Sequence, residues 1–188
     1  MKIRLVKPSD CKQILEIYHQ YINTEITFEY ELPSENDFLK RIEEINEFYP
    51  YLILEEKEKI IGYAYAHRLR ERAAYQWIAE LSIYFDKNST SKGYGKILYE
   101  KLLQCLKLQG IKTVYGCVTM PNEKSENLHE KLGFKNVGRF TKAGYKNGKW
   151  LDIVWFEKNL SPCEINPQDV VPIHKTNQDE LEKILSVN

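Results

Sequence analysis

A strand-like segment, a glycine loop and a helix-like segment follow one another in the middle of the chain. Residues 79–85 read AELSIYF, and apolar and polar side chains alternate there as in a β-strand. Residues 91–103 read SKGYGKILYEKLL, where two glycines precede leucines at helical spacing. A helix N-terminus carries unbonded N–H groups and a partial positive charge. This succession predicts an α/β fold and favours an anion site at the start of the helix.

Two common phosphate-binding motifs are absent from this loop. The P-loop pattern G-x-x-x-x-G-K-[ST] is approached only by GFKNVGRF at residues 133–140, which lacks the Lys-Ser/Thr pair. The dinucleotide pattern G-x-G-x-x-G fails because Gly93 and Gly95 are followed by leucine at the third glycine position. Two interpretations remain. The loop turns its N–H groups onto a pyrophosphate, with Lys92 and Lys96 adding charge, or it is a plain turn before a core helix.

The remaining patterns predict a mixed, mostly antiparallel sheet with flanking helices, in the order β-α-α-β-β-β-α-β-α-β-β. Strands are expected at residues 2–6, 51–56, 59–69, 77–85 and 111–119, with two more between 135 and 160. Helices are expected at residues 8–22, 34–50, 93–108 and 121–134. The character changes after Leu160, where three prolines precede a helical pattern. We therefore interpret residues 1–160 as one domain and 161–188 as an appendage, with a docking strand and a helix.

Composition narrows the possible partners and the cellular compartment. Lys+Arg and Asp+Glu both number 27, so the balanced charge argues against a nucleic-acid partner. The four cysteines form no C-x-x-C pair and no zinc spacing, which predicts reduced thiols and no metal site (Cys11, Cys105, Cys117 and Cys163). No stretch approaches the roughly 18 apolar residues of a membrane span. The first residues lack the apolar run of a signal peptide. We expect a cytoplasmic protein without a membrane anchor.

Several segments together resemble the GNAT N-acetyltransferases. These are the loop STSKGYGKILYEKLL after the strand AELSIYF, and PNEKSENLHEKLGF further along. The segments YPYLILEE, GYAYAHRLRERAAYQWIAELSIYF and FTKAGYKNGKWLDIVWFEKNL resemble the phosphinothricin acetyltransferase branch in order and register. The resemblance extends from Lys2 to about Asn159. It implies the GNAT fold with splayed central strands, acetyl-CoA as cosubstrate, a small-molecule amine acceptor and a homodimer.

The resemblance also implies where acetyl-CoA binds. The loop would hold its pyrophosphate, and the end of the preceding strand would offer main-chain groups to the pantetheine arm, which Asn122 would bond from the far side. The implied residues are Ile83, Tyr84, Phe85, Ser91, Lys92, Gly93, Tyr94, Gly95, Lys96 and Asn122. One position departs from the family pattern. Thr90 stands where the family usually has Arg or Gln, which weakens one phosphate contact but leaves the backbone cradle.

Two residues are candidates for the proton transfers of acetyl transfer to an amine. Glu80 lies in the otherwise apolar WIAELSIYF, and it is either a solvent-facing strand residue or a base whose pKa burial raises. His129 stands where the superfamily typically has a tyrosine that protonates the leaving thiolate. The alternative interpretation is a solvent-exposed helix histidine without a catalytic role. The resemblance favours the catalytic interpretation of both. Tyr99 is expected in the core, and His19, His67 and His174 are expected to be ordinary solvent-exposed histidines.

The branch suggests an acceptor pocket formed by Phe28, Arg70, Arg72, Tyr75 and Trp155. Guanidinium groups suit bidentate binding of a carboxylate or phosphinate. The alternative interpretation of RLRER is a solvent-exposed run of charged residues. Arg70 falls where the branch carries lysine. The favoured function is acetyl transfer to a small acidic amino acid or its phosphinic or sulfoximine analogue. Two alternatives remain: another acceptor (a protein N-terminus, a polyamine or an antibiotic amine), or a non-catalytic module that binds acyl-CoA.

Overall fold

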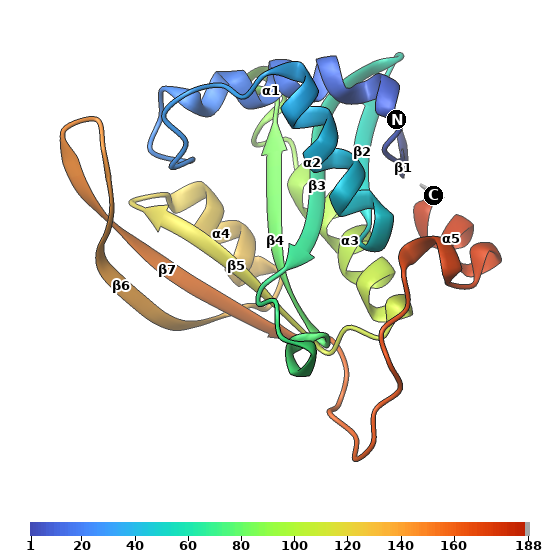
Figure 1. The fold of residues 1–188 in the computed structure, drawn as a ribbon. Coiled ribbons are helices and arrows are strands. Elements are labelled where there is room, and N and C mark those ends of the chain that lie inside the picture. The colour runs from blue at the N-terminus through green and yellow to red at the C-terminus, as the bar shows by residue number, and fades with distance from the viewer. Residues whose placement is uncertain (187–188) are drawn as a thin grey trace.

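A seven-stranded sheet runs through the computed structural model, which describes residues 1–186 (Figure 1). The order across the sheet is β1-β2-β3-β4-β5-β7-β6, and only β4 and β5 pair in parallel. The strands are β1 (Lys2–Leu5), β2 (Tyr51–Glu56), β3 (Lys59–Arg68), β4 (Ile78–Phe85), β5 (Thr113–Met120), β6 (Lys135–Lys146) and β7 (Lys149–Asn159). The predicted mixed, mostly antiparallel sheet and the order of its elements are confirmed.

The helices begin and end at residues with recognisable capping chemistry. Ser34 accepts a hydrogen bond from the Asp37 N–H at the start of α2, as an N-cap serine does. Gly93 and Gly110 flank α3 with φ angles of 84° and 98°, a left-handed conformation that costs glycine little. The described helices are α1 (Cys11–Ile22), α2 (Glu35–Phe48), α3 (Tyr94–Gln109), α4 (Glu123–Lys131) and α5 (Gln178–Leu185), with short 3-10 turns η1 (Pro8–Asp10), η2 (Ala73–Tyr75), η3 (Lys87–Ser89) and η4 (Ile173–Lys175).

The two faces of the sheet are covered by different helices. On one face α1 and α2 pack over β2 and β3, where Ile14, Ile17 and Tyr18 are buried as their spacing predicts. On the other face α3 packs over the same strands, and α4 packs over β5. Tyr99 of α3 is buried in this second core, which confirms its predicted place. Strands β2 and β3 therefore send alternate side chains into two separate cores.

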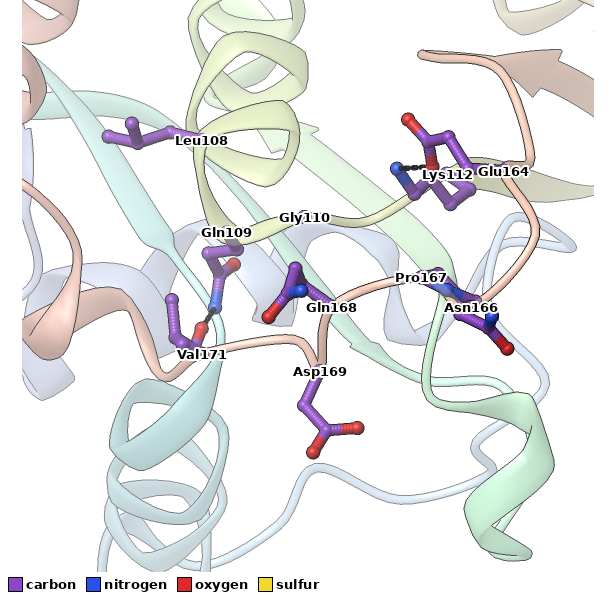
Figure 2. Close-up of a pocket in the computed structure, with 10 residues that line it drawn as sticks. All are labelled: Leu108, Gln109, Gly110, Lys112, Glu164, Asn166, Pro167, Gln168, Asp169 and Val171. Carbon is purple, nitrogen blue, oxygen red and sulfur yellow. Dashed lines mark hydrogen bonds and ion pairs between the residues drawn. The ribbon is translucent and has the colours of Figure 1, made fainter.

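The segment after Leu160 packs on the body of the protein without forming a strand. Val170, Ile173 and Leu181 belong to the main core, and the Gln109 amide donates to the Val171 carbonyl at 2.8 Å (Figure 2). The helix predicted here is present as α5, but the predicted docking strand is wrong for the described residues. Pro162, Pro167 and Pro172 explain this, because proline lacks the N–H that a strand ladder needs.

A further structural finding concerns membranes: none of the helices described in residues 1–186 combines the length and the apolar character that crossing a bilayer requires.

Candidate functional site

Strands β4 and β5 separate halfway along their length. They pair only from Ile78 to Leu81 and from Thr113 to Gly116, after which β4 stays with β3 and β5 stays with β7 (Figure 1). Beyond Leu81 the edge of β4 that faced β5 therefore has no strand partner among the described residues. Unpaired strand edges present N–H and C=O groups in a row. The splay predicted from the resemblance is present, and it opens beside Ile83, Tyr84 and Phe85.

The glycine loop connects the open end of β4 to α3. Gly93 is the N-cap of α3, and nothing lies within 4 Å of the position where a Cβ would stand. The Lys96 N–H bonds the Gly93 carbonyl, while the main-chain N–H groups of Tyr94 and Gly95 bond no main-chain carbonyl in residues 1–186. These free N–H groups and the helix dipole favour an anion at this position. The Thr90 hydroxyl donates to the Lys87 carbonyl at 3.1 Å, so it stabilises the turn.

Glu80 lies on the sheet face that α1 and α2 partly cover. It is half-buried and stands between His67 of β3 and Tyr115 of β5 in the register of the sheet. Burial raises the pKa of the Glu80 carboxyl, and the nearby His67 and Arg70 oppose that rise. A carboxylate with a raised pKa in a partly dry site is suited to accept a proton near neutral pH.

His129 approaches the sheet from the opposite face. It is 2% exposed, which excludes the alternative of an exposed helix histidine. Its Nδ1 lies 2.8 Å from the Ser125 carbonyl, so Nδ1 donates and the neutral ring carries its lone pair on Nε2. Nε2 has no partner among the described residues and lies against Gly116. Burial lowers the pKa of His129, opposed by the Ser125 hydrogen bond. The net shift favours the neutral ring.

Glu80 and His129 meet the central strands where these separate. Leu81 and Gly116 form the last pair between β4 and β5. Glu80 is one residue before that pair on one face, and His129 contacts Gly116 on the other. The arrangement places a proton acceptor on each side of the point where the sheet opens. Asn122 is close in sequence to this helix and caps α4, because its side chain accepts from the Ser125 N–H.

The residues expected to bind the acceptor do not all line one pocket. Arg70, Arg72 and Tyr75 line one open pocket of about 380 Å³ after β3. Phe28 lies outside this pocket. Its ring packs against Gly144 of β6, in the space that the side chain of any other residue there would need. Trp155 is opposite Cys117 in the β5–β7 register, and its indole N–H has no partner within residues 1–186. Phe28 and Trp155 do not line the pocket of the arginines.

A buried lysine that sequence reasoning missed joins the Phe28 loop to the β6–β7 hairpin. Lys146 is 3% exposed, and its ammonium donates to the carbonyls of Ile22 at 2.7 Å and Thr27 at 2.5 Å. Ile22 ends α1, where a helix carries partial negative charge. The ion pair of Lys149 with Glu25 at 2.9 Å adds a second link. The only sequence signal for this contact is a lysine next to a hairpin turn, which is usually solvent-exposed.

The protein-family model of the acetyltransferase (GNAT) domain matches residues 3–155. This range includes the splayed strands, the glycine loop, Glu80 and His129. The match ends before the segment that follows Leu160.

Individual relatives agree with this family. The chain is 30% identical to phosphinothricin N-acetyltransferase of Streptomyces viridochromogenes, over 92% of this chain and 94% of the relative. It is 28% identical to the L-methionine sulfoximine/L-methionine sulfone acetyltransferase of Salmonella typhimurium, over 85% of this chain and 95% of that relative. The fold also matches a crystal structure of a GNAT superfamily phosphinothricin acetyltransferase from Sinorhizobium meliloti in complex with AcCoA. The TM-score is 0.84 and the sequence identity 33%, over 90% of this chain and 94% of that chain.

Proposed function

The chain belongs to the acetyltransferase (GNAT) family, and on that premise we propose that it transfers the acetyl group of acetyl-CoA to the amine of a small acidic amino acid or analogue. The proposed acceptors are of the phosphinothricin or methionine sulfoximine type, which the names of the relatives give for those proteins. The observation that carries the proposal is the separation of β4 and β5 beside Glu80, with the free N-terminus of α3 at the same end of β4.

The loop and the open strand edge fit acetyl-CoA. The pyrophosphate would lie on residues 91–96, where the N–H groups of Tyr94 and Gly95 are free and Gly93 leaves space. The pantetheine arm would bond the main chain of residues 83–85, and Asn122 would face it from the other side. Lys92 is exposed and adds positive charge. Acetyl-CoA supplies an acetyl group that its thioester bond activates toward an amine.

Glu80 and His129 divide the proton transfers in this proposal. An aliphatic amine with a pKa near about 10 is mostly charged at neutral pH, so Glu80 accepts a proton and leaves the nitrogen free to attack. His129 exchanges a proton through Nε2 on the other side of the sheet. Nδ1 is held by the Ser125 carbonyl, so Nε2 is the nitrogen available to the reaction. Direct attack by the amine requires no covalent intermediate on the enzyme.

Acceptor selection is assigned to the arginines after β3. Arg70 is near enough to Glu80 to affect the pKa of its carboxyl, so an acid group bound by Arg70 would direct the amine toward Glu80. Arg72 and Tyr75 line the same pocket. Phe28 and Trp155 would take part from the hairpin side of the opening. A cationic acceptor, such as a polyamine, would be disfavoured by these arginines.

We also propose a homodimer. The β6–β7 hairpin exposes large apolar side chains at Val137, Phe140, Tyr145 and Trp150. Exposed apolar groups on an edge strand favour pairing with another chain.

The experiment that tests the function is thiol release from acetyl-CoA across a panel of amines. The panel contains phosphinothricin, methionine sulfoximine, common amino acids, polyamines and aminoglycosides. Turnover confined to the first two or to acidic amino acids supports the proposal. Turnover with polyamines or aminoglycosides contradicts the proposed acceptor. An enzyme that binds acetyl-CoA and is silent across the panel favours a macromolecular acceptor or a non-catalytic module.

A further inference from the structure

His67 lies directly across from Glu80 in the sheet. The antiparallel pair β3–β4 aligns the two residues, and directly opposite side chains in such a pair have Cβ atoms about 4.5–5.5 Å apart. Alternation puts both side chains on the same face, together with Tyr65 and Ser82. No direct hydrogen bond joins His67 to Glu80 within the described residues. Two polar side chains opposed in this way without a direct hydrogen bond can be bridged by one water.

The orientation of the His67 ring uses Nδ1 for a hydrogen bond within the protein and leaves Nε2 without one among the residues that the structure describes. Nδ1 lies 3.2 Å from the Arg68 carbonyl, which can only accept, so Nδ1 is the donor. In the neutral ring the lone pair is then on Nε2. The ring also packs on Tyr65, with centroids 6.0 Å apart and planes at 39°. This orientation leaves Nε2 free to take up a proton.

His67 also lines an open cleft of about 720 Å³ at the end of β3. The cleft lies between the C-terminal part of α2, the end of β3 and the turn η4 of the tail. Its charged or titratable walls comprise Glu44 and Glu47 of α2, Arg68 and Glu71 after β3, and His174 and Lys175 of η4. Tyr49 lines the cleft as well. These groups carry both signs, and water in such a cleft can accept protons.

We propose that His67 is a proton relay: it takes from Glu80, through one water, the proton that Glu80 removes from the acceptor amine, and releases it to solvent in the cleft. The inference rests on the proposed acetyltransferase function. The half-buried position of Glu80 explains the need for a relay. Half-buried Glu80 does not line the cleft, whereas His67, opposite it in the sheet, does.

The proton count of the reaction leaves one proton for this route. An acceptor that enters as an ammonium ion loses two protons as its nitrogen becomes an amide. The C–S bond of the thioester breaks as the C–N bond forms, and the leaving sulfur takes up one of the two protons. The second goes from Glu80 to Nε2 of His67, which then loses it to water. Glu80 returns to the carboxylate and His67 to the neutral ring, and nothing is oxidised or reduced.

The test is chemical rescue of His67→Ala by diffusible bases. The variant should have a turnover number about 10²-fold lower, at the lower end of the range for lost proton-transfer catalysis, with unchanged KM for acetyl-CoA. Added imidazole should restore turnover in proportion to its concentration, and substituted imidazoles should rescue in the order of their basicity. Glu80→Gln, which lacks the proton acceptor itself, should not be rescued. His174→Gln, on the other wall of the cleft, should resemble the parent.

Each outcome bears on the relay. Rescue that depends on the basicity of the added imidazole supports it, because a purely structural role would not respond to the base. A fully active His67→Ala overturns it, as does a slow variant that no base restores. His67→Gln, which keeps a polar side chain of similar length, guards against misfolding and should be slow with a normal free energy of unfolding. A parent enzyme that acetylates no amine overturns the proposed function and the relay together, whereas an active parent with an unaffected His67→Ala overturns the relay alone.

Discussion

Gly116→Ala should force His129 away from the sheet, and the cost can be worked from the structure. A Cβ on residue 116 would lie 2.3 Å from His129 Nε2 and 3.0 Å from Cδ2. An unstrained contact needs about 3.5 Å, so the ring must withdraw by roughly 1 Å. The ring has little room for this, because Phe134 and Phe156 pack against it with centroids 4.9 and 5.0 Å away. Overpacking of this kind costs about 1–3 kcal/mol in the free energy of unfolding.

The assay is a double-mutant cycle measured by urea denaturation. Gly116→Ala should destabilise the parent protein by that amount. In the His129→Ala background the same change should be neutral or stabilising by up to about 1 kcal/mol, because alanine in place of glycine restricts the unfolded chain. The difference between the two stability changes is the coupling free energy, which measures the contact between residue 116 and His129. An equal loss of stability in both backgrounds would refute the close approach of His129 to Gly116. The turnover number of Gly116→Ala should fall with the displacement of Nε2.

Three further predictions concern Glu80, Gly93 and Lys146. Glu80→Gln should lower the turnover number by about 10²-fold or more with little change in acetyl-CoA affinity, and parent activity should decline as pH falls through the raised pKa of Glu80, since only the carboxylate accepts a proton. Above that pKa the same variant should be more stable to urea than the parent. In the parent, folded Glu80 binds its proton more tightly than Glu80 of the unfolded chain, so the parent loses stability as pH rises, whereas the glutamine does not titrate. Gly93→Ala, at φ 84°, should cost about 1 kcal/mol and raise KM for acetyl-CoA; an unchanged KM would argue against the loop as the cofactor site. Lys146→Met should cost about 1–3 kcal/mol by leaving two buried carbonyls unpaired, and should raise KM for the amine more than for acetyl-CoA; equal effects on both would assign Lys146 to stability alone.

The features that the sequence predicted well depend on local chemistry. Gly93 marked the start of α3, because the left-handed backbone there favours glycine. Ser34 marked the start of α2 for a similar reason, since its hydroxyl caps an N–H three residues on. Such signals act within a few residues, so one sequence is enough to recognise them.

The features that the sequence missed depend on contacts between distant segments. His67 looked like an ordinary surface histidine, because only the β3–β4 register brings it opposite Glu80. Gly116 within TVYGCVT was a detectable signal, since a glycine inside a β-branched strand often marks a close approach. The group that approaches it, His129, could not be identified without the fold. The tail strand was predicted from a short apolar run, but Val170 and Ile173 enter the core from an irregular segment.

Hydrogen exchange with and without acetyl-CoA tests the central claim most directly. The amides of Tyr94 and Gly95 lack main-chain partners in the described structure, so they should exchange fast in the free protein. Acetyl-CoA should slow exchange at these amides and at residues 83–85, where β4 has its open edge. The account would be contradicted by unchanged exchange there together with protection at the pocket of about 410 Å³ around Gln109 and Asp169, at the opposite end of α3 (Figure 2).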